Sequence, residues 1–156
     1  MNIEKPNRQK HSYVQRIAAT PETVFPLLCP VMEVKWVPGW MPATVLSETG
    51  VVEQECIFTT PSKPYDSIWV VTKHDPDRYR LEMYKVSPDH SVTKLEIALS
   101  GEHDGTTSAH VAYEVTAIGS AGEKFVEEFT EEWYEGFMQS WEKAMNHYLK
   151  TGNKII

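Results

Sequence analysis

The sequence has 156 residues, of which 41% are hydrophobic and 24% are charged. This balance is typical of a folded globular protein, and the length suits a single domain over residues 1–156, with its core over about 11–150. The formal net charge is -7. Because neutralising phosphates requires clustered Lys and Arg, we expect no nucleic-acid partner.

The sequence also carries information on cell compartment. No apolar run approaches the roughly 18 residues of a membrane span, and the polar segment 1–10 lacks the apolar centre of a signal peptide. Cys29 and Cys56 are the only cysteines, which does not indicate a disulfide framework and favours a reducing, cytoplasmic location. A single Cys29–Cys56 bond is left as an open alternative.

The first elements in chain order are a strand and two short helices. His11–Ala18 contains the β-favouring side chains of a strand. Thr20–Glu22, with the sequence Thr-Pro-Glu, is a helix start: Thr can cap, Pro suits the first position and Glu meets the positive helix end. A second short helix is predicted over Val31–Trp36, and the Pro- and Gly-rich segment Val37–Pro42 predicts a turn.

Six strand patterns then follow, separated by turn residues such as Thr49-Gly50. They are predicted at Ala43–Glu48, Val52–Thr60, Ser67–Lys73, Arg78–Val86, Val92–Ser100 and Ser108–Ala117. Because the connections are short, neighbouring strands should be antiparallel. Together with the first strand they predict a sheet of about seven strands.

Alternation along these strands predicts which side chains face inward. The inward sets are Tyr79, Leu81 and Met83; Leu95, Ile97 and Leu99; and Val111, Tyr113, Val115 and Ala117. In the second strand of the six, the predicted inward set is Gln54, Cys56, Phe58 and Thr60. Ile68–Val71 is apolar on both faces, so its phase is not readable, and a homodimer through its outer face is an open alternative.

A long aromatic helix is predicted at the end of the chain, over about Gly122–Leu149. Residues at intervals of four form its stripe: Phe125, Phe129, Trp133, Phe137, Trp141 and Met145. An apolar stripe this wide needs a partner surface, which only the predicted sheet offers. The element order β-αα-β6-α therefore predicts an α+β fold in which the space between sheet and helix is either filled or left as a cavity.

This order of elements resembles the START-related helix-grip superfamily (SRPBCC), which includes polyketide cyclases and dehydrases, plant pathogenesis-related proteins and lipid-transfer domains. The resemblance covers about residues 11–150 and rests on Ala19–Phe25 (ATPETVF), Trp36–Trp40 (WVPGW) and the helix Trp133–Tyr148. The chain is similar to a bacterial branch of the superfamily without a settled activity. The resemblance implies a curved antiparallel sheet wrapped around a C-terminal helix, with an elongated hydrophobic cavity between them, and implies no reaction.

Aromatic and apolar side chains are the candidate contacts for a flat or greasy ligand in such a cavity. They are Trp36, Trp40, Phe58, Trp69, Met83, Ile97, Tyr113, Trp133, Phe137 and Trp141. For Trp133 and Trp141, a core role and a ligand-wall role are equally supported. Trp36 and Trp40 flank either a structural turn, which we favour, or a pocket rim. Tyr113 is the preferred polar contact, because its strand phase meets the helix.

No catalytic residue is assigned. The six His residues lack metal-ligand spacing, the Glu pairs at 127–128 and 131–132 fit a solvated helix face, and no nucleophile motif or phosphate-binding loop occurs. We therefore expect neither a metal nor a cofactor. The preferred hypothesis is a carrier or sensor of a small hydrophobic molecule. The alternatives are a polyketide cyclase- or dehydratase-like enzyme and a protein-interaction module with a filled core.

Overall fold

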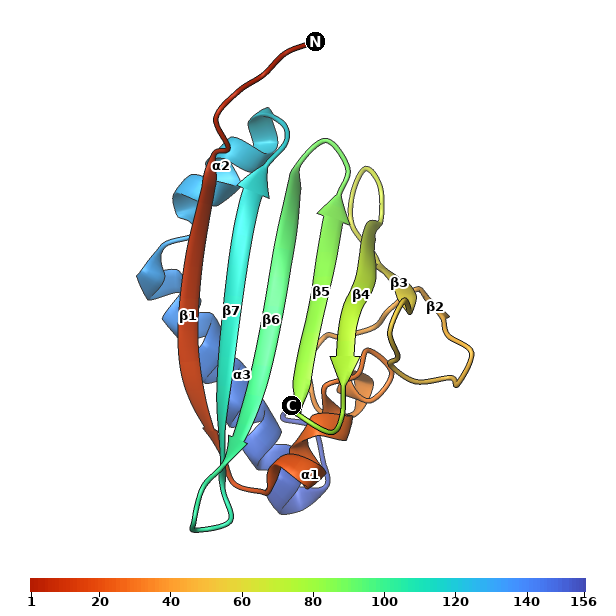
Figure 1. Ribbon diagram of the computed structural model, residues 1–156, viewed down its shortest axis with the longest axis vertical. Helices are drawn as coiled ribbons and strands as arrows, with labels where there is room; N and C mark the ends of the chain where they lie inside the picture. The colour runs from red at the N-terminus through yellow and green to blue at the C-terminus, as the bar shows by residue number, and fades with distance from the viewer.

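The computed structural model describes residues 1–156 and contains one seven-stranded antiparallel sheet with helices on one face (Figure 1). The strands are β1 (Arg8–Ile17), β2 (Thr44–Leu46), β3 (Ile57–Thr60), β4 (Ser67–Asp75), β5 (Arg80–Ser87), β6 (Ser91–Gly101) and β7 (Thr107–Ala117). The helices are α1 (Pro21–Val24), η1 (Phe25–Leu27), η2 (Glu33–Lys35), α2 (Ser120–Glu128) and α3 (Glu131–Thr151), where η marks a 3-10 helix. The predicted α+β architecture is confirmed.

The strand order is β1-β7-β6-β5-β4-β3-β2, so the first strand lies beside the last and the others form a meander. The inward phases predicted for β5, β6 and β7 are confirmed. The buried members of the predicted sets are Leu81, Met83, Leu95, Ile97, Leu99, Val111 and Val115, and Tyr79, Tyr113 and Ala117 are partly buried and pack against this core. In β4 the phase is now clear: Trp69 and Val71 are buried, whereas Ile68 is 41% exposed on the outer face. A homodimer through that outer face stays a prediction.

The predicted strand Val52–Thr60 is wrong over its first half. Only Ile57–Thr60 forms β3, because Glu53 to Cys56 makes a turn in which Glu55 adopts a left-handed backbone (φ 67°). This turn removes the alternation, so Gln54 is exposed instead of facing inward, while Cys56 and Phe58 are buried. Cys29 and Cys56 are both buried free thiols, so the disulfide alternative is not realised.

The predicted long helix is in fact two helices. The break falls at Phe129 and Thr130, where Thr130 is extended and its side chain accepts a hydrogen bond from the Trp133 backbone N–H (3.2 Å). Glu131 and Glu132 follow in the first turn of α3. The capping Thr and the acidic first turn stabilise this new helix start. Thr20 precedes α1 in the same way, but its side chain makes no capping hydrogen bond, so the cap predicted there is not formed.

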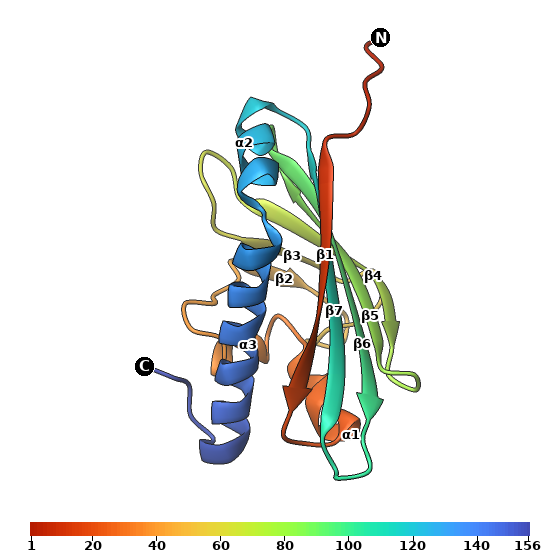
Figure 2. The same ribbon diagram turned by 90° about the vertical axis from the view of Figure 1, so that its left-hand side faces the viewer.

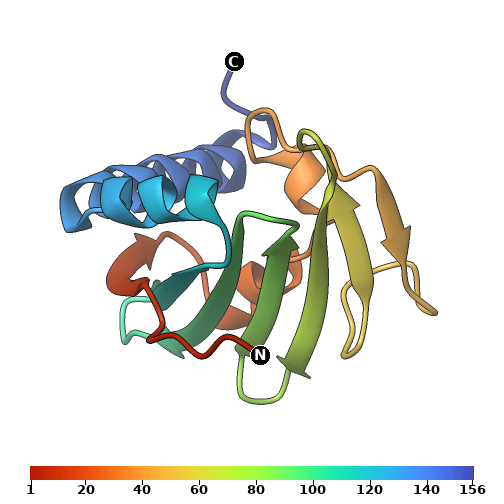
Figure 3. The same cartoon turned by 90° about the horizontal axis from the view of Figure 1, so that it is seen from above.

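Helix α3 lies along the edge strand β1, and α2 lies over β7 (Figures 2 and 3). Helix side chains satisfy the free backbone edge of β1: the Glu142 carboxylate accepts from Arg16 N (2.8 Å), and Asn146 bonds both Ala18 N (2.8 Å) and Arg16 O (3.0 Å). The buried Gln15 amide donates to Met138 O (3.0 Å). These hydrogen bonds hold α3 beside β1. They also cover the backbone edge of β1, which could otherwise pair with a strand of another chain.

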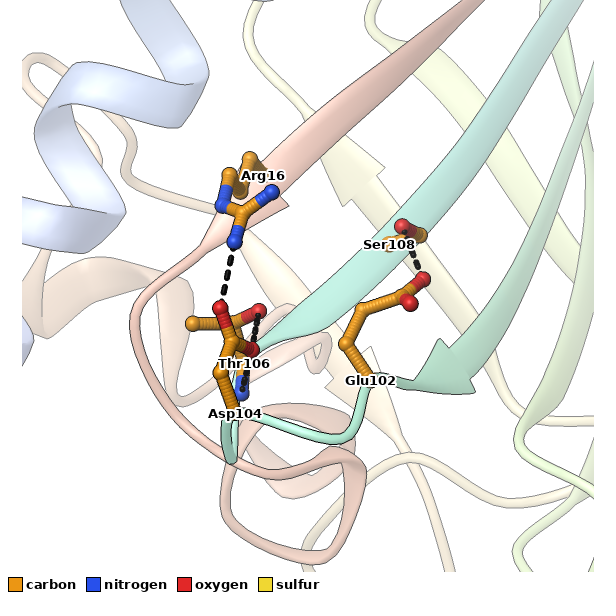
Figure 4. A network of polar contacts seen from close by, with 5 residues as sticks. All are labelled: Arg16, Glu102, Asp104, Thr106 and Ser108. Carbon is orange, nitrogen blue, oxygen red and sulfur yellow. Dashed lines mark hydrogen bonds and ion pairs between the residues drawn. The ribbon is translucent and has the colours of Figure 1, made fainter.

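The loop between β6 and β7 lies beside the end of β1 (Figure 4). Asp104 accepts hydrogen bonds from the Thr106 hydroxyl and backbone N–H and pairs with Arg16 of β1. The hydrogen bonds from Thr106, with a smaller effect of Arg16, hold the pKa of Asp104 below its ordinary value. Ser108 donates to Glu102 across the same loop (2.7 Å). These contacts are solvent-exposed and position the loop rather than a reactive site.

No helix in the structure combines the length and apolar character needed to cross a membrane.

Candidate functional site

A cavity of about 290 Å³ lies between the sheet and α3. Its lining comes from the sheet, from α2 and α3, and from the segment before β2, and 15 of its 19 residues are hydrophobic. They are Pro30, Glu33, Val37, Trp40, Phe58, Trp69, Leu81, Met83, Lys85, Thr93, Leu95, Ile97, Tyr113, Val115, Phe125, Phe129, Trp133, Phe137 and Trp141. The space between sheet and helix is therefore not filled by side chains.

The sheet supplies the floor of the cavity in rows of residues paired across β5, β6 and β7. Lys85, Thr93 and Val115 form one row, and the row beside it is Met83, Leu95 and Tyr113. A third row contains Leu81 and Ile97. Because side chains two residues apart share a face, all three rows point at the helix side. Lys85 and Thr93 thus lie in one row and Tyr113 in the row beside it, on a floor that is otherwise apolar.

Helix α3 forms one wall of the cavity with one set of side chains and packs into the protein core with another set. Tyr134 and Met138 are fully buried, and the Tyr134 hydroxyl donates to Val111 O (2.6 Å) in β7. Trp133, Phe137 and Trp141, which recur every four residues, line the cavity instead. Because Trp133 is also 50% exposed, it lies where the cavity reaches the surface. The four-residue stripe is therefore mainly a cavity wall.

The segment before β2 forms the second wall, and two indoles hold it in place. Trp36 is fully buried and its Nε1 donates to Leu27 O (3.0 Å), while Trp40 Nε1 donates to Pro30 O (2.8 Å). These bonds fold residues 27–40 back on themselves. As a result, Glu33 on η2 and Trp40 both line the cavity.

The far end of the cavity is aromatic. Phe58 and Trp69, which pair across β3 and β4, stack with ring centroids 5.2 Å apart and an interplanar angle of 12°. Trp40 meets both rings edge-on at 6.1 Å. The Lys85 ammonium lies 5.2 Å from the Trp69 ring centroid, within the range of a cation–π contact. This end therefore offers flat apolar surface beside one cationic group.

Four polar side chains of the lining, Glu33, Lys85, Thr93 and Tyr113, make no hydrogen bond or ion pair with the protein. No polar side-chain atom that is sealed from solvent lacks a partner anywhere in the structure. The polar atoms of these four residues are therefore accessible from the cavity they line. They are free to bond to an occupant.

Burial shifts the protonation equilibria of these groups. It raises the pKa of the Glu33 carboxyl from its ordinary value of 4.5 to about 8, and it lowers the pKa of the Lys85 ammonium. Burial and, to a lesser degree, the charge of Glu33 raise the pKa of the Tyr113 hydroxyl. The dominant cause in all three is loss of water around the charged form. Glu33 is therefore largely protonated at neutral pH.

The structure brings all of the predicted ligand contacts except Trp36 to the cavity. Trp36 is excluded because its ring packs behind Trp141, with centroids 5.1 Å apart. Other polar residues considered as inward-facing are elsewhere: Thr60 accepts from Trp69 Nε1 (3.0 Å), and Tyr79 packs on Phe25 at 5.8 Å. Neither lines the cavity. Tyr113 does, as expected from its strand phase.

Sequence reasoning missed three of the four polar groups. Lys85 continues the inward phase of Leu81 and Met83, and Thr93 precedes Leu95 on the same phase. A charged residue on an apolar face was therefore a readable signal. Glu33 had none, because its position depends on the tertiary fold of residues 27–40. No group of three or more His, Cys, Asp or Glu side chains is placed to hold a metal ion.

The sequence matches no protein-family model and no curated protein. Solved structures match its fold. A protein of unknown function from Staphylococcus aureus has 11% identity over 95% of this chain and 97% of its own, with a TM-score of 0.69. The norcoclaurine synthase of Thalictrum flavum, in complex with dopamine and hydroxybenzaldehyde, has 11% identity over 92% and 87%, with a TM-score of 0.65. A START superfamily protein from Mycobacterium smegmatis has 11% identity over 90% and 97%, with a TM-score of 0.63. The helix-grip fold expected from the sequence is confirmed.

Proposed function

We propose that this protein binds a small hydrophobic or aromatic molecule in the cavity between the sheet and α3, as a carrier or sensor. The observation that carries the proposal is the cavity itself, with 15 hydrophobic residues in its lining and four polar groups left without a protein partner. A mostly apolar concavity with a few convergent polar groups is the usual form of a small-molecule site. Its volume is near the small end of the usual range of about 300 to 1,000 Å³.

Two further observations support an aromatic occupant. The indole and phenyl rings of Trp40, Phe58 and Trp69 surround one end, where flat rings stack or pack edge-on. A protein of the same fold, norcoclaurine synthase, is found in complex with two aromatic molecules. A module whose core is filled is the least compatible with an open cavity.

An enzyme of the cyclase or dehydratase type is the second candidate, and one observation favours it. The Glu33 carboxyl has a pKa of about 8 and shares the cavity with the Tyr113 hydroxyl. A group that titrates near neutral pH is suited to proton transfer. Turnover of a bound molecule would distinguish the enzyme from the carrier, since both need the same cavity.

A cavity-filling substitution tests the proposal. Leu95 lies in the middle row of the floor and is 5% exposed, so Leu95→Trp should place an indole in the space a ligand would occupy. We expect naphthaleneethanol, an uncharged two-ring probe, to bind wild type at one site per chain in calorimetry. Leu95→Trp should weaken binding by about tenfold or more, which corresponds to about 1.4 kcal/mol.

The matched control is Leu46→Trp, the same substitution at a β2 residue that is 61% exposed and outside the cavity. It should leave probe affinity unchanged, and circular dichroism should show both variants folded. Equal probe binding by wild type and folded Leu95→Trp would place the probe elsewhere and reject the proposal.

A further inference from the structure

Glu33 is an unusual side chain for the wall of an aromatic cavity. Its carboxyl has neither a hydrogen bond nor an ion pair with the protein, although it lines a space whose lining is mostly hydrophobic. Placing a carboxylate in such surroundings without a partner is costly. The backbone of this residue is held in place, because Glu33 N donates to Cys29 O (2.8 Å) and Glu33 O accepts from the backbone of Trp36 and Val37. An acid without a partner at a fixed backbone position in the cavity wall indicates a partner that arrives with the occupant.

We infer that the occupant carries a basic nitrogen, bound as an ammonium group by Glu33, with its aromatic or apolar body between the sheet and Trp133, Phe137 and Trp141. This inference rests on the proposed function, since it names the ligand class of the same cavity. A protonated amine satisfies the geometry because it supplies the missing charge and hydrogen-bond donors to the carboxylate. Aromatic rings around it add a favourable interaction with its charge.

The other ionisable groups of the cavity do not replace this partner. Lys85 forms no ion pair with Glu33, so their charged atoms are more than 4.0 Å apart, and its ammonium lies over the Trp69 ring instead. The Tyr113 hydroxyl is close enough to Glu33 for the carboxylate to raise its pKa, and it stays neutral over the working pH range. It can donate a hydrogen bond to the carboxylate or the ligand. Tyr134, the next phenol, already donates to Val111 O.

Binding of an amine should depend on pH with a defined sign. Glu33 is mostly protonated below about pH 8, and the carboxyl must lose that proton to pair with an ammonium. Affinity for the cation should therefore rise about tenfold per pH unit from pH 6 to about pH 8, with release of about one proton per ligand. As the pH rises Lys85 also loses its charge, which would likewise raise the affinity for a cation. A Glu33 variant is therefore needed to separate the effect of Glu33 from that of Lys85.

The experiment compares three probes that share one naphthalene body: naphthaleneethylamine, naphthaleneethanol and naphthaleneacetate. Calorimetry at pH 8 measures affinity, and calorimetry at pH 7 in two buffers of different ionisation enthalpy measures proton release, for wild type, Glu33→Gln and Glu135→Gln. Gln keeps the size of Glu, and Glu135 is an exposed carboxylate on α3, so its variant removes the same charge outside the cavity. Circular dichroism checks that both variants are folded.

We expect the amine to bind wild type and Glu135→Gln at least about tenfold more tightly than the alcohol. Glu33→Gln should abolish this preference and the proton release. If the alcohol binds wild type as tightly as the amine, or the acetate binds more tightly than either, the amine inference fails and the cavity proposal stands. If none of the three binds, the cavity proposal itself fails. An amine preference that survives in Glu33→Gln would also overturn the inference.

Discussion

Gly122→Ala should destabilise the protein by about 3 kcal/mol or more, the upper end of the usual cost of overpacking. Gly122 lies in the first turns of α2, where an added Cβ would be 1.7 Å from the His90 carbonyl oxygen and 2.8 Å from its carbon. That oxygen cannot move freely, because it accepts a hydrogen bond from Ile118 N (2.9 Å). The methyl group would push α2 away from the turn between β5 and β6. Urea unfolding, which reports the free energy of unfolding, measures the effect.

Gly136→Ala is the matched control and should have the opposite sign. Gly136 is exposed in the middle of α3, and a Cβ there would have no atom within 4 Å. Replacing a helical Gly with Ala should stabilise the protein by about 0.5 to 1 kcal/mol. Equal urea midpoints for Gly122→Ala and wild type would show that α2 does not approach the sheet as closely as described.

Trp36→Ala should destabilise the protein by about 3 to 5 kcal/mol, the range for removing a buried Trp side chain. Trp36 is fully buried, packs on Trp141, and its indole satisfies Leu27 O. Its removal leaves a void and an unpaired carbonyl, and it releases the segment that carries Glu33. Thermal or urea unfolding would measure the loss.

Trp133→Ala, compared with Trp36→Ala, tests whether Trp133 contributes to the cavity and Trp36 to the core. Because Trp133 is 50% exposed at the cavity mouth, its removal should cost only about 1 kcal/mol while weakening the binding of naphthaleneethanol. A large stability loss for Trp133→Ala and a small one for Trp36→Ala would reverse the assigned roles.

The sheet and its inward faces were predictable because strand alternation is a local property. The apolar residues of β5 to β7 must face the core wherever one side of a sheet is buried, and so Met83, Ile97 and Tyr113 could be placed near the helix before the fold was known. The two-faced pattern of Ile68–Val71 allowed no such prediction. There, pairing with β3 and β5 decides that Trp69 points inward.

The roles of the tryptophans could not be predicted for a related reason. Trp36 and Trp40 are four residues apart on one Pro- and Gly-rich turn, yet the first is core and the second is cavity wall. The difference comes from which carbonyl each indole reaches, and that depends on the tertiary path of the chain. The break at Thr130, in contrast, was readable, since Thr-Glu-Glu is a capping residue followed by an acidic first turn.

The most direct test of a ligand cavity between sheet and helix uses the methyl groups of the six methionines. Met83 lines the cavity, Met138 and Met145 are buried outside it, and Met41 is 64% exposed. With 13C-labelled methionine methyl groups, titration with naphthaleneethanol should shift the Met83 resonance to saturation at one probe per chain, with little change at Met41. Shifts at Met41 with an unchanged Met83 would place the probe on the surface and contradict the account.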